Sequence, residues 1–172
     1  MKLTDILKKE KWLELENETY QKSGLNASAY NTEGVRVAGA IQNWANRICP
    51  AIKATDKGQT FICAVGHMNM ANAAQKTKKP VAEECDAGLI KIVIPIFVKG
   101  EFIGSFSACG LLPEETEIDT FLINKTTDIE ESKIAELSND IGTISNNKIE
   151  EVTAFMKEKV EKIVANFEKS RQ

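Results

Sequence analysis

Four cysteines and one histidine are the residues of this chain best suited to chemistry: Cys49, Cys63, Cys85, Cys109 and His67. A single histidine excludes any mechanism that needs two. His67 follows Cys63 by four positions, and on a helix that spacing places both side chains on one face. Four thiolates suit a zinc ion or an iron–sulfur cluster. The set is therefore a candidate metal site, in which His67 is the less favoured ligand.

The spacing of the cysteines leaves other interpretations open. Successive cysteines lie 14, 22 and 24 positions apart, without the C-x-x-C pair that compact zinc and ferredoxin-type sites usually contain. Redox-sensitive thiols and buried cysteines that only pack are the alternatives. A Cys63–His67 nucleophilic pair is disfavoured, because no oxyanion donor or orienting acid accompanies it on the same helix. We therefore expect the protein not to be an enzyme.

Polar and aromatic residues near the cysteines extend the candidate site. Asp86 follows Cys85 and either accepts a hydrogen bond from a ligand hydroxyl or caps backbone amides in a turn. Tyr30 and Trp44 either wall a ligand cavity or pack in the core. No phosphate-binding loop, dinucleotide fingerprint or nucleophile elbow is present in the sequence.

Composition limits the class of protein. The 172 residues, 42% hydrophobic and 27% charged with a net charge of −3, fit one globular domain and argue against a broad nucleic-acid-binding surface. No apolar run approaches the roughly 20 residues that span a bilayer, so no membrane contact is expected. The N-terminus lacks the layout of a signal peptide. These features predict a cytoplasmic protein, whose cysteines are thiols or metal ligands rather than disulfides.

Hydrophobic periodicity predicts the elements that position these residues. Helices are expected at 3–16, 39–48 and 58–77, with a hairpin at 27–38 around a turn that ends in Gly34. Pro50 is expected to end the second of these helices.

The second half of the chain is predicted to hold the centre of the sheet. Strands at 89–98 and 102–108 form a hairpin, with Pro95 at a bulge or an unpaired position. A connector at 111–128 and two helices follow.

The last two helices are expected at 129–139 and 147–169. Apolar residues of 147–169 form a seam of about three heptads, which fits a homodimer contact or packing on the chain's own sheet. The element order predicts an α+β domain with an antiparallel sheet.

Several motifs resemble the sensory domain family named after PocR, the regulator of propanediol utilisation. The matching stretches, in chain order, are Tyr30–Gly34, Trp44–Cys49 with Ile52-Lys53, Gly58 with Cys63, Cys85-Asp86-Ala87-Gly88-Leu89, Pro95-Ile96 and Gly104. The resemblance covers roughly residues 5–167. In this sequence Asp86 stands where the family usually has a histidine beside the cysteine, so a histidine-dependent ligand contact is not expected.

The resemblance implies a PAS- or GAF-like fold, with a five-stranded antiparallel sheet and flanking helices around a pocket for small diols or hydrocarbon derivatives. We accordingly expect one domain over 1–172, with a core at 5–145 and a C-terminal helix for packing, dimerisation or output. No output module fits within the chain, so the domain is expected either to stand alone with a separate output protein or to be a fragment of a longer protein. The candidate ligand-binding residues are Tyr30, Trp44, Cys63, His67, Cys85, Asp86 and Gly88. The alternative function is a redox or gas sensor with a metal or iron–sulfur cluster on the four cysteines.

Overall fold

The structure is a computed structural model that describes residues 1–171 and has an antiparallel sheet at its centre. Four strands run in the order β1-β4-β3-β2, and a separate parallel pair is formed by β5 and β6. The strands are β1 (Asn26–Tyr30), β2 (Val81–Glu84), β3 (Ile90–Val98), β4 (Glu101–Cys109), β5 (Leu112–Pro113) and β6 (Thr143–Ile144). The α+β class is confirmed, but the main sheet has four strands rather than the five expected.

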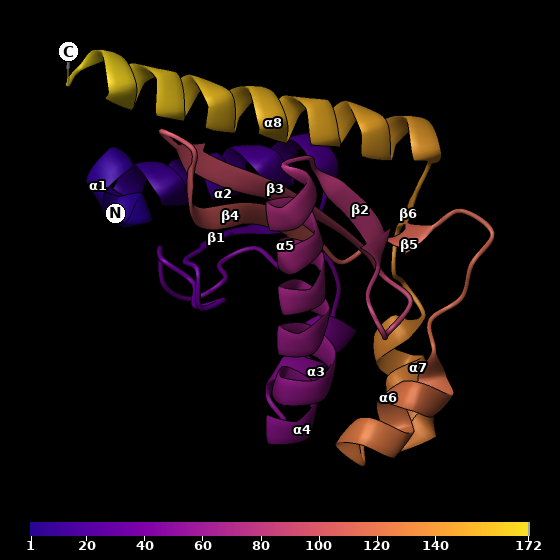
Figure 1. Cartoon of the computed structure of the whole chain (residues 1–172). Coiled ribbons are helices and arrows are strands. Elements are labelled where there is room, and N and C mark those ends of the chain that lie inside the picture. Colours follow the sequence, from indigo (N-terminus) through magenta and orange to yellow (C-terminus); the bar gives the residue numbers. More distant parts are fainter. Residues whose placement is uncertain (172) are drawn as a thin grey trace.

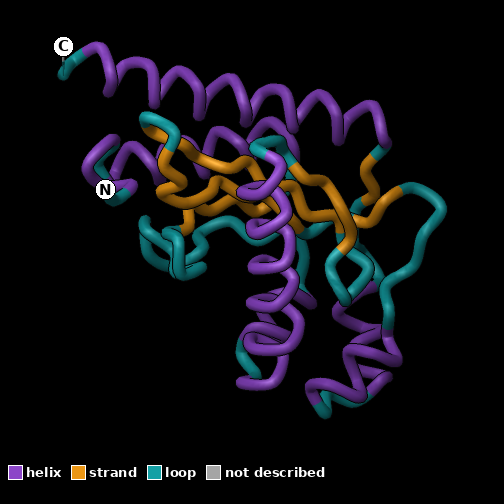
Figure 2. Tube along the Cα trace, viewed as in Figure 1, coloured by secondary structure: helices purple, strands orange, loops and turns teal. Residues whose placement is uncertain are grey.

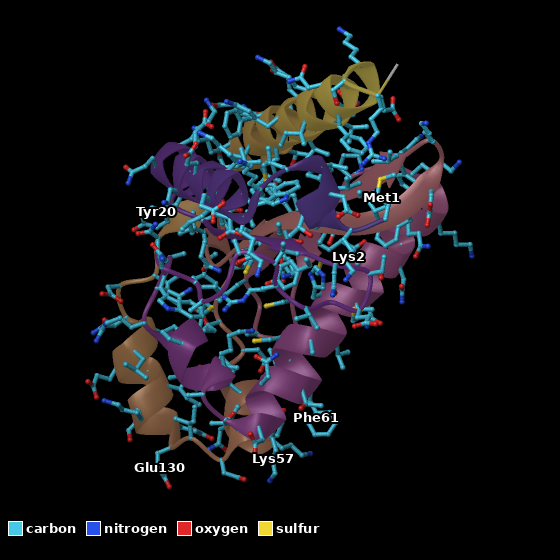
Figure 3. All side chains as sticks on the ribbon, turned by 90° about the vertical axis from the view of Figure 1, so that its left-hand side faces the viewer. Met1, Lys2, Tyr20, Lys57, Phe61 and Glu130 are labelled. Atoms are coloured by element: carbon cyan, nitrogen blue, oxygen red, sulfur yellow. The ribbon has the colours of Figure 1, made fainter. Side chains whose placement is uncertain are left out.

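Helices cover both faces of this sheet (Figures 1 and 2). They are α1 (Leu3–Ile6), α2 (Lys9–Ser23), α3 (Ile48–Lys53), α4 (Asp56–Gly58), the π-helix η1 (Gln59–Ala64), α5 (Val65–Thr77), α6 (Thr120–Thr127), α7 (Glu131–Ser138) and α8 (Asn146–Lys169). In Figure 1, α8 lies above the sheet, whereas α3, α4 and most of α5 lie below it, and α1 and α2 share the core on the α8 side.

The upper face of the sheet is apolar and carries the main core. Alternate residues of a strand point to opposite faces, so Ala29, Phe106 and Ile94, which stand opposite one another on β1, β4 and β3, share this face. Trp12 of α2 stacks on Phe106 and donates a hydrogen bond from Nε1 to the carbonyl oxygen of Leu3 at 3.1 Å. Burial of this layer is the main source of stability.

The lower face of the sheet is polar over much of its area. The row Asn26, Cys109 and Lys91 crosses β1, β4 and β3, and the next two rows place Ser107 and Ser105 on the same side. Only the end covered by α5 is apolar, where Val93 packs on Met70 and Ala74 of that helix. A buried sheet face of this composition is unusual, because buried polar groups require partners.

The apolar seam of α8 packs on the upper face of the sheet. Val152, Met156 and Val160 are buried in the main core, and α8 contacts β3, α2 and α1. The seam predicted at 147–169 is therefore occupied by contacts within the chain. A homodimer through the same residues would require those contacts to break.

The helix predicted at 39–48 is not formed, because polar side chains hold this stretch as a loop. Asn26 accepts a hydrogen bond from Ala45 N through Oδ1 at 3.4 Å, and Asn43 donates to Asn17 at 2.7 Å. Such bonds compete with helix formation. The helix begins at Ile48 instead, and Pro50 lies in its first turn, where its missing N–H is not needed.

Other predicted boundaries also change. The helix expected at 3–16 is split at Leu7, which is extended, and the connector expected at 111–128 contains α6. The hairpin expected at 27–38 turns at Gly34, but its second arm is reduced to a single bridge between Tyr30 and Arg36.

The central hairpin and the long helices follow the predictions closely. Pro95 pairs with Ser105 on β4, and β2 ends its pairing at Val93, so the missing N–H of Pro95 faces no partner strand. Among residues 1–171, no helix has the length and apolar character needed to cross a bilayer.

Candidate functional site: a cavity under the sheet

A cavity of about 290 Å³ lies between the polar face of the sheet and the helices below it. Its floor is formed by Asn26 and Tyr30 of β1, Lys91 of β3 and Cys109 of β4. Its volume is at the lower end of the range for small-molecule sites. The sequence therefore forms an internal space at the one sheet face that it leaves polar.

The walls of the cavity come from several other segments. They are the hairpin tip with Gly34, Val35 and Arg36, the 39–47 loop with Ile41 and Trp44, α3 with Cys49, Ile52 and Lys53, and η1 with α5, which provide Ile62, Cys63, Ala64 and His67. Cys85, Ala87 and Leu89 close the side next to β3. Val35 is 56% exposed, so one wall lies at the molecular surface.

Close packing fixes the positions of the hairpin tip at Gly34 and of the 39–47 loop, which form two walls of the cavity. Gly34 has a φ of +75°, and a Cβ there would lie 2.6 Å from Met68 Sδ, so the tip sits directly on α5. Asn46 donates from Nδ2 to Gly110 O at 2.7 Å and to Cys49 Sγ at 3.2 Å. The cavity is therefore built from rigidly tethered segments.

Three basic side chains and no carboxylate line the cavity. Arg36, Lys53 and Lys91 form none of the ion pairs found among residues 1–171. Burial, with repulsion from Arg36 and Lys91, lowers the pKa of Lys53, and Cys63 opposes this only when its thiol is ionised. Each positive charge around the cavity therefore makes the charged form of the others less favourable.

Lys91 is the most deeply placed of these cations, with 6% of its surface exposed. Burial alone lowers the pKa of Lys91, but attraction to Cys109 and Tyr30 in their anionic forms raises it above its ordinary value. Its ammonium lies 5.7 Å from the centre of the Tyr30 ring. At neutral pH the Tyr30 phenol is protonated, so Lys91 is a buried basic group without an anionic partner there, and an anion in the cavity favours its charged form.

His67 is buried against Tyr30 without a hydrogen bond. The two rings are 4.0 Å apart between centroids, and neither Nδ1 nor Nε2 has a partner. Burial, reinforced by repulsion from Lys91 and Lys53, lowers the pKa of His67 to about 3. The imidazole is therefore neutral at physiological pH, and both of its nitrogens remain unsatisfied.

The four cysteines all line the cavity, from α3, η1, the segment before β3 and the end of β4. All four are free thiols. Burial is the largest cause that raises the pKa of Cys49, Cys63 and Cys85. Within residues 1–171, however, no three histidine, cysteine or acidic side chains are grouped closely enough to hold a metal ion. The arrangement gives no support to the metal or iron–sulfur alternative.

The residues predicted for a ligand site are divided by the structure. Tyr30, Trp44, Cys63, His67 and Cys85 line the cavity. Asp86 and Gly88 do not. The Asp86 side chain is exposed, and a Cβ at Gly88, whose φ is +86°, would face the backbone oxygen of Glu117 at 3.0 Å.

Lys91, Lys53, Arg36, Asn26 and Gln59 are the polar cavity residues that the sequence reasoning did not include in the site. A signal was available for Lys91, because it is the one charged residue within the apolar stretch Ile90–Val98. A lysine inside a buried strand requires a partner or a function. Arg36 lies between Val35 and Val37 and Lys53 between Ile52 and Ala54, but neither interrupts a long apolar stretch, so no comparable signal marks them.

Comparison with known proteins identifies the family of the chain. No curated protein and no solved structure matches the chain. The family described as the sensory domain found in PocR matches residues 5–167, nearly the whole chain. This match agrees with the resemblance of the cysteine and glycine motifs. The chain therefore belongs to the PocR sensory domain family.

Proposed function

We propose that this chain is a non-enzymatic ligand-sensing domain of a signalling system, and that the cavity under the sheet is its small-molecule site. Membership of a sensory domain family supports the signalling role. The size of the cavity, about 290 Å³, fits a small metabolite rather than a nucleotide or a peptide.

The observation that carries the proposal is the location of the unsatisfied polar groups. Five buried side-chain nitrogen or oxygen atoms among residues 1–171 lack a hydrogen-bond partner, and they belong to Arg36, His67, Ser105 and Ser107. Arg36 and His67 line the cavity, and the two serines lie on the sheet face that forms its floor. Because such groups usually find partners in folded proteins, their concentration here favours a site that a polar ligand or water completes.

The signal would pass through the sheet. The cavity lies on one face of the sheet and α8 packs on the other, so β3 contacts both. A ligand changes the position of α8 only if it binds two arrangements of the domain with different affinities. The receiving component is proposed to be a separate output protein.

A thermal-shift experiment with a cavity-filling variant tests the proposed site. The purified chain is screened against small alcohols, diols, aldehydes, amides and carboxylates, because binding to the folded state alone raises the melting temperature. Ala64→Phe fills the cavity from η1, and Ala73→Phe, at an exposed position of α5, is the matched control.

A compound that stabilises the wild type and Ala73→Phe but not Ala64→Phe is the expected result. Stabilisation that survives in Ala64→Phe would place the ligand elsewhere and refute the proposed site. Circular dichroism of both variants verifies that the fold is retained.

A further inference from the structure

The charge around the cavity indicates the chemical class of its ligand, and this inference rests on the proposed function. Arg36, Lys53 and Lys91 line one space of about 290 Å³ without a carboxylate in its walls. Cations grouped in a partly buried space repel one another and lose hydration, which costs free energy unless an anion joins them.

The nearby carboxylates do not neutralise these cations. Glu83 stands opposite Lys91 on β2, but its side chain is exposed and forms no ion pair with Lys91. Glu16 lies outside the cavity wall, accepts a hydrogen bond from Ala29 N at 2.9 Å and is attracted to Arg36, which opposes the rise of the Glu16 pKa on burial. The charges of Lys53 and Lys91 are therefore left for a bound group.

The other cavity groups add donors rather than negative charge. A terminal nitrogen of Arg36 is buried without a partner, and both nitrogens of His67 are unpartnered. Tyr30 is neutral at physiological pH, because burial raises the pKa of its phenol. A neutral imidazole still donates one hydrogen bond.

Much of the remaining lining is apolar and suits a short hydrocarbon part, beside the amides of Asn26 and Gln59 and the four thiols. The apolar side chains are those of Val35, Ile41, Trp44, Ile52, Ile62, Ala87 and Leu89. A ligand that matches both the basic and the apolar side chains of the cavity has one anionic end and one apolar end. Inorganic anions match only the basic side chains.

We propose that the ligand of this cavity is a small monocarboxylate, with its carboxylate held by Lys91, Lys53 and Arg36 and its hydrocarbon part packed on the apolar wall. Lys91 is the central contact, because it is the most buried of the three and lies on the cavity floor. Binding offsets the repulsion among the three cations and gives partners to groups that have none.

Isothermal titration calorimetry on the whole chain tests this inference with matched probes. Acetate, propionate and butyrate are compared with propionamide, which resembles propionate but is neutral, with propane-1,2-diol, and with inorganic phosphate. Lys91→Met removes the central charge and keeps the length of the side chain. Lys57→Met, at an exposed lysine of α4 that pairs with Asp128, is the control.

We expect propionate or butyrate to bind at least about tenfold more tightly than propionamide, the minimum factor for a hydrogen bond to a charged group. Lys91→Met should remove that preference, and Lys57→Met should leave it intact. Should Lys91→Met fail to fold, Lys53→Met and Arg36→Met each remove one of the other positive charges of the cavity wall and test the same preference for a carboxylate.

Three results would overturn the inference. They are equal binding of propionate and propionamide, carboxylate binding that Lys91→Met leaves unchanged, and tighter binding of phosphate than of any carboxylate. Diol binding that Ala64→Phe abolishes, without carboxylate binding, would refute the anionic ligand and leave the proposed sensory cavity intact. Stabilisation that survives in Ala64→Phe would refute both.

Discussion

Protonation of His67 should make the domain sensitive to mild acid. His67 is the single histidine of the chain, is 3% exposed and is packed against Tyr30. Its pKa falls from 6.5 to about 3 on folding, chiefly through burial. The unfolded chain therefore binds a proton at this site between pH 6.5 and pH 3 while the folded chain does not. Stability consequently falls as the pH decreases through this window.

The size of the effect follows from the two pKa values. Between about pH 7.5 and pH 5 the linkage relation gives a loss of about 2 kcal/mol in the free energy of unfolding. With a urea dependence of about 2 kcal/mol/M, the midpoint of unfolding should decrease by about 1 M. Urea titrations followed by circular dichroism at the two pH values measure this change.

His67→Phe provides the comparison. Phenylalanine preserves the ring that packs on Tyr30 and removes two nitrogens that have no hydrogen-bond partner. Its stability at neutral pH should equal or exceed that of the wild type, because no hydrogen bond is lost and an unsatisfied polar group is removed. Other groups, including buried Glu16, titrate in both proteins. The difference between the two pH dependences therefore isolates His67, and parallel dependences would refute the assignment of a buried neutral imidazole.

Two further predictions concern the cavity walls. Cys49, Cys63 and Cys85 should react with iodoacetamide more slowly in the native chain than in the denatured chain at neutral pH. The reason is that burial raises the pKa of each thiol, and the thiolate is the reactive form. Mass spectrometry measures the rates of modification, and equal rates in the two states would contradict the burial. Gly110→Ala should destabilise the domain by about 2 kcal/mol more than Gly100→Ala. Both glycines have positive φ, but only a Cβ at position 110 would lie 2.7 Å from both Ala45 Cβ and Asn26 Oδ1. Denaturation midpoints test this difference, and equal losses would show that the loop yields without cost.

Local sequence patterns predicted the elements whose hydrophobic periodicity is strong. The central hairpin, the helical stretch before it and the C-terminal helix were located within a few residues, because each buries one face against the core. The prediction of a helix at 39–48 was wrong, because hydrogen bonds that Asn26 and Asn17 accept from this stretch hold it as a loop. The PAS- or GAF-like assignment and the homodimer stay predictions.

The candidate site was likewise predicted in part from the sequence and decided in part by the tertiary structure. The sequence by itself identified residues suited to chemistry, so the four cysteines, His67 and Tyr30 were predicted before their positions were known. Only the tertiary structure decided that all of them line one cavity, that Asp86 points to solvent and that Lys91 provides a buried basic group. The physical reason is that burial and charge pairing depend on strand register and on contacts between distant segments. A shift of one residue would have turned Lys91 to the opposite face of the sheet.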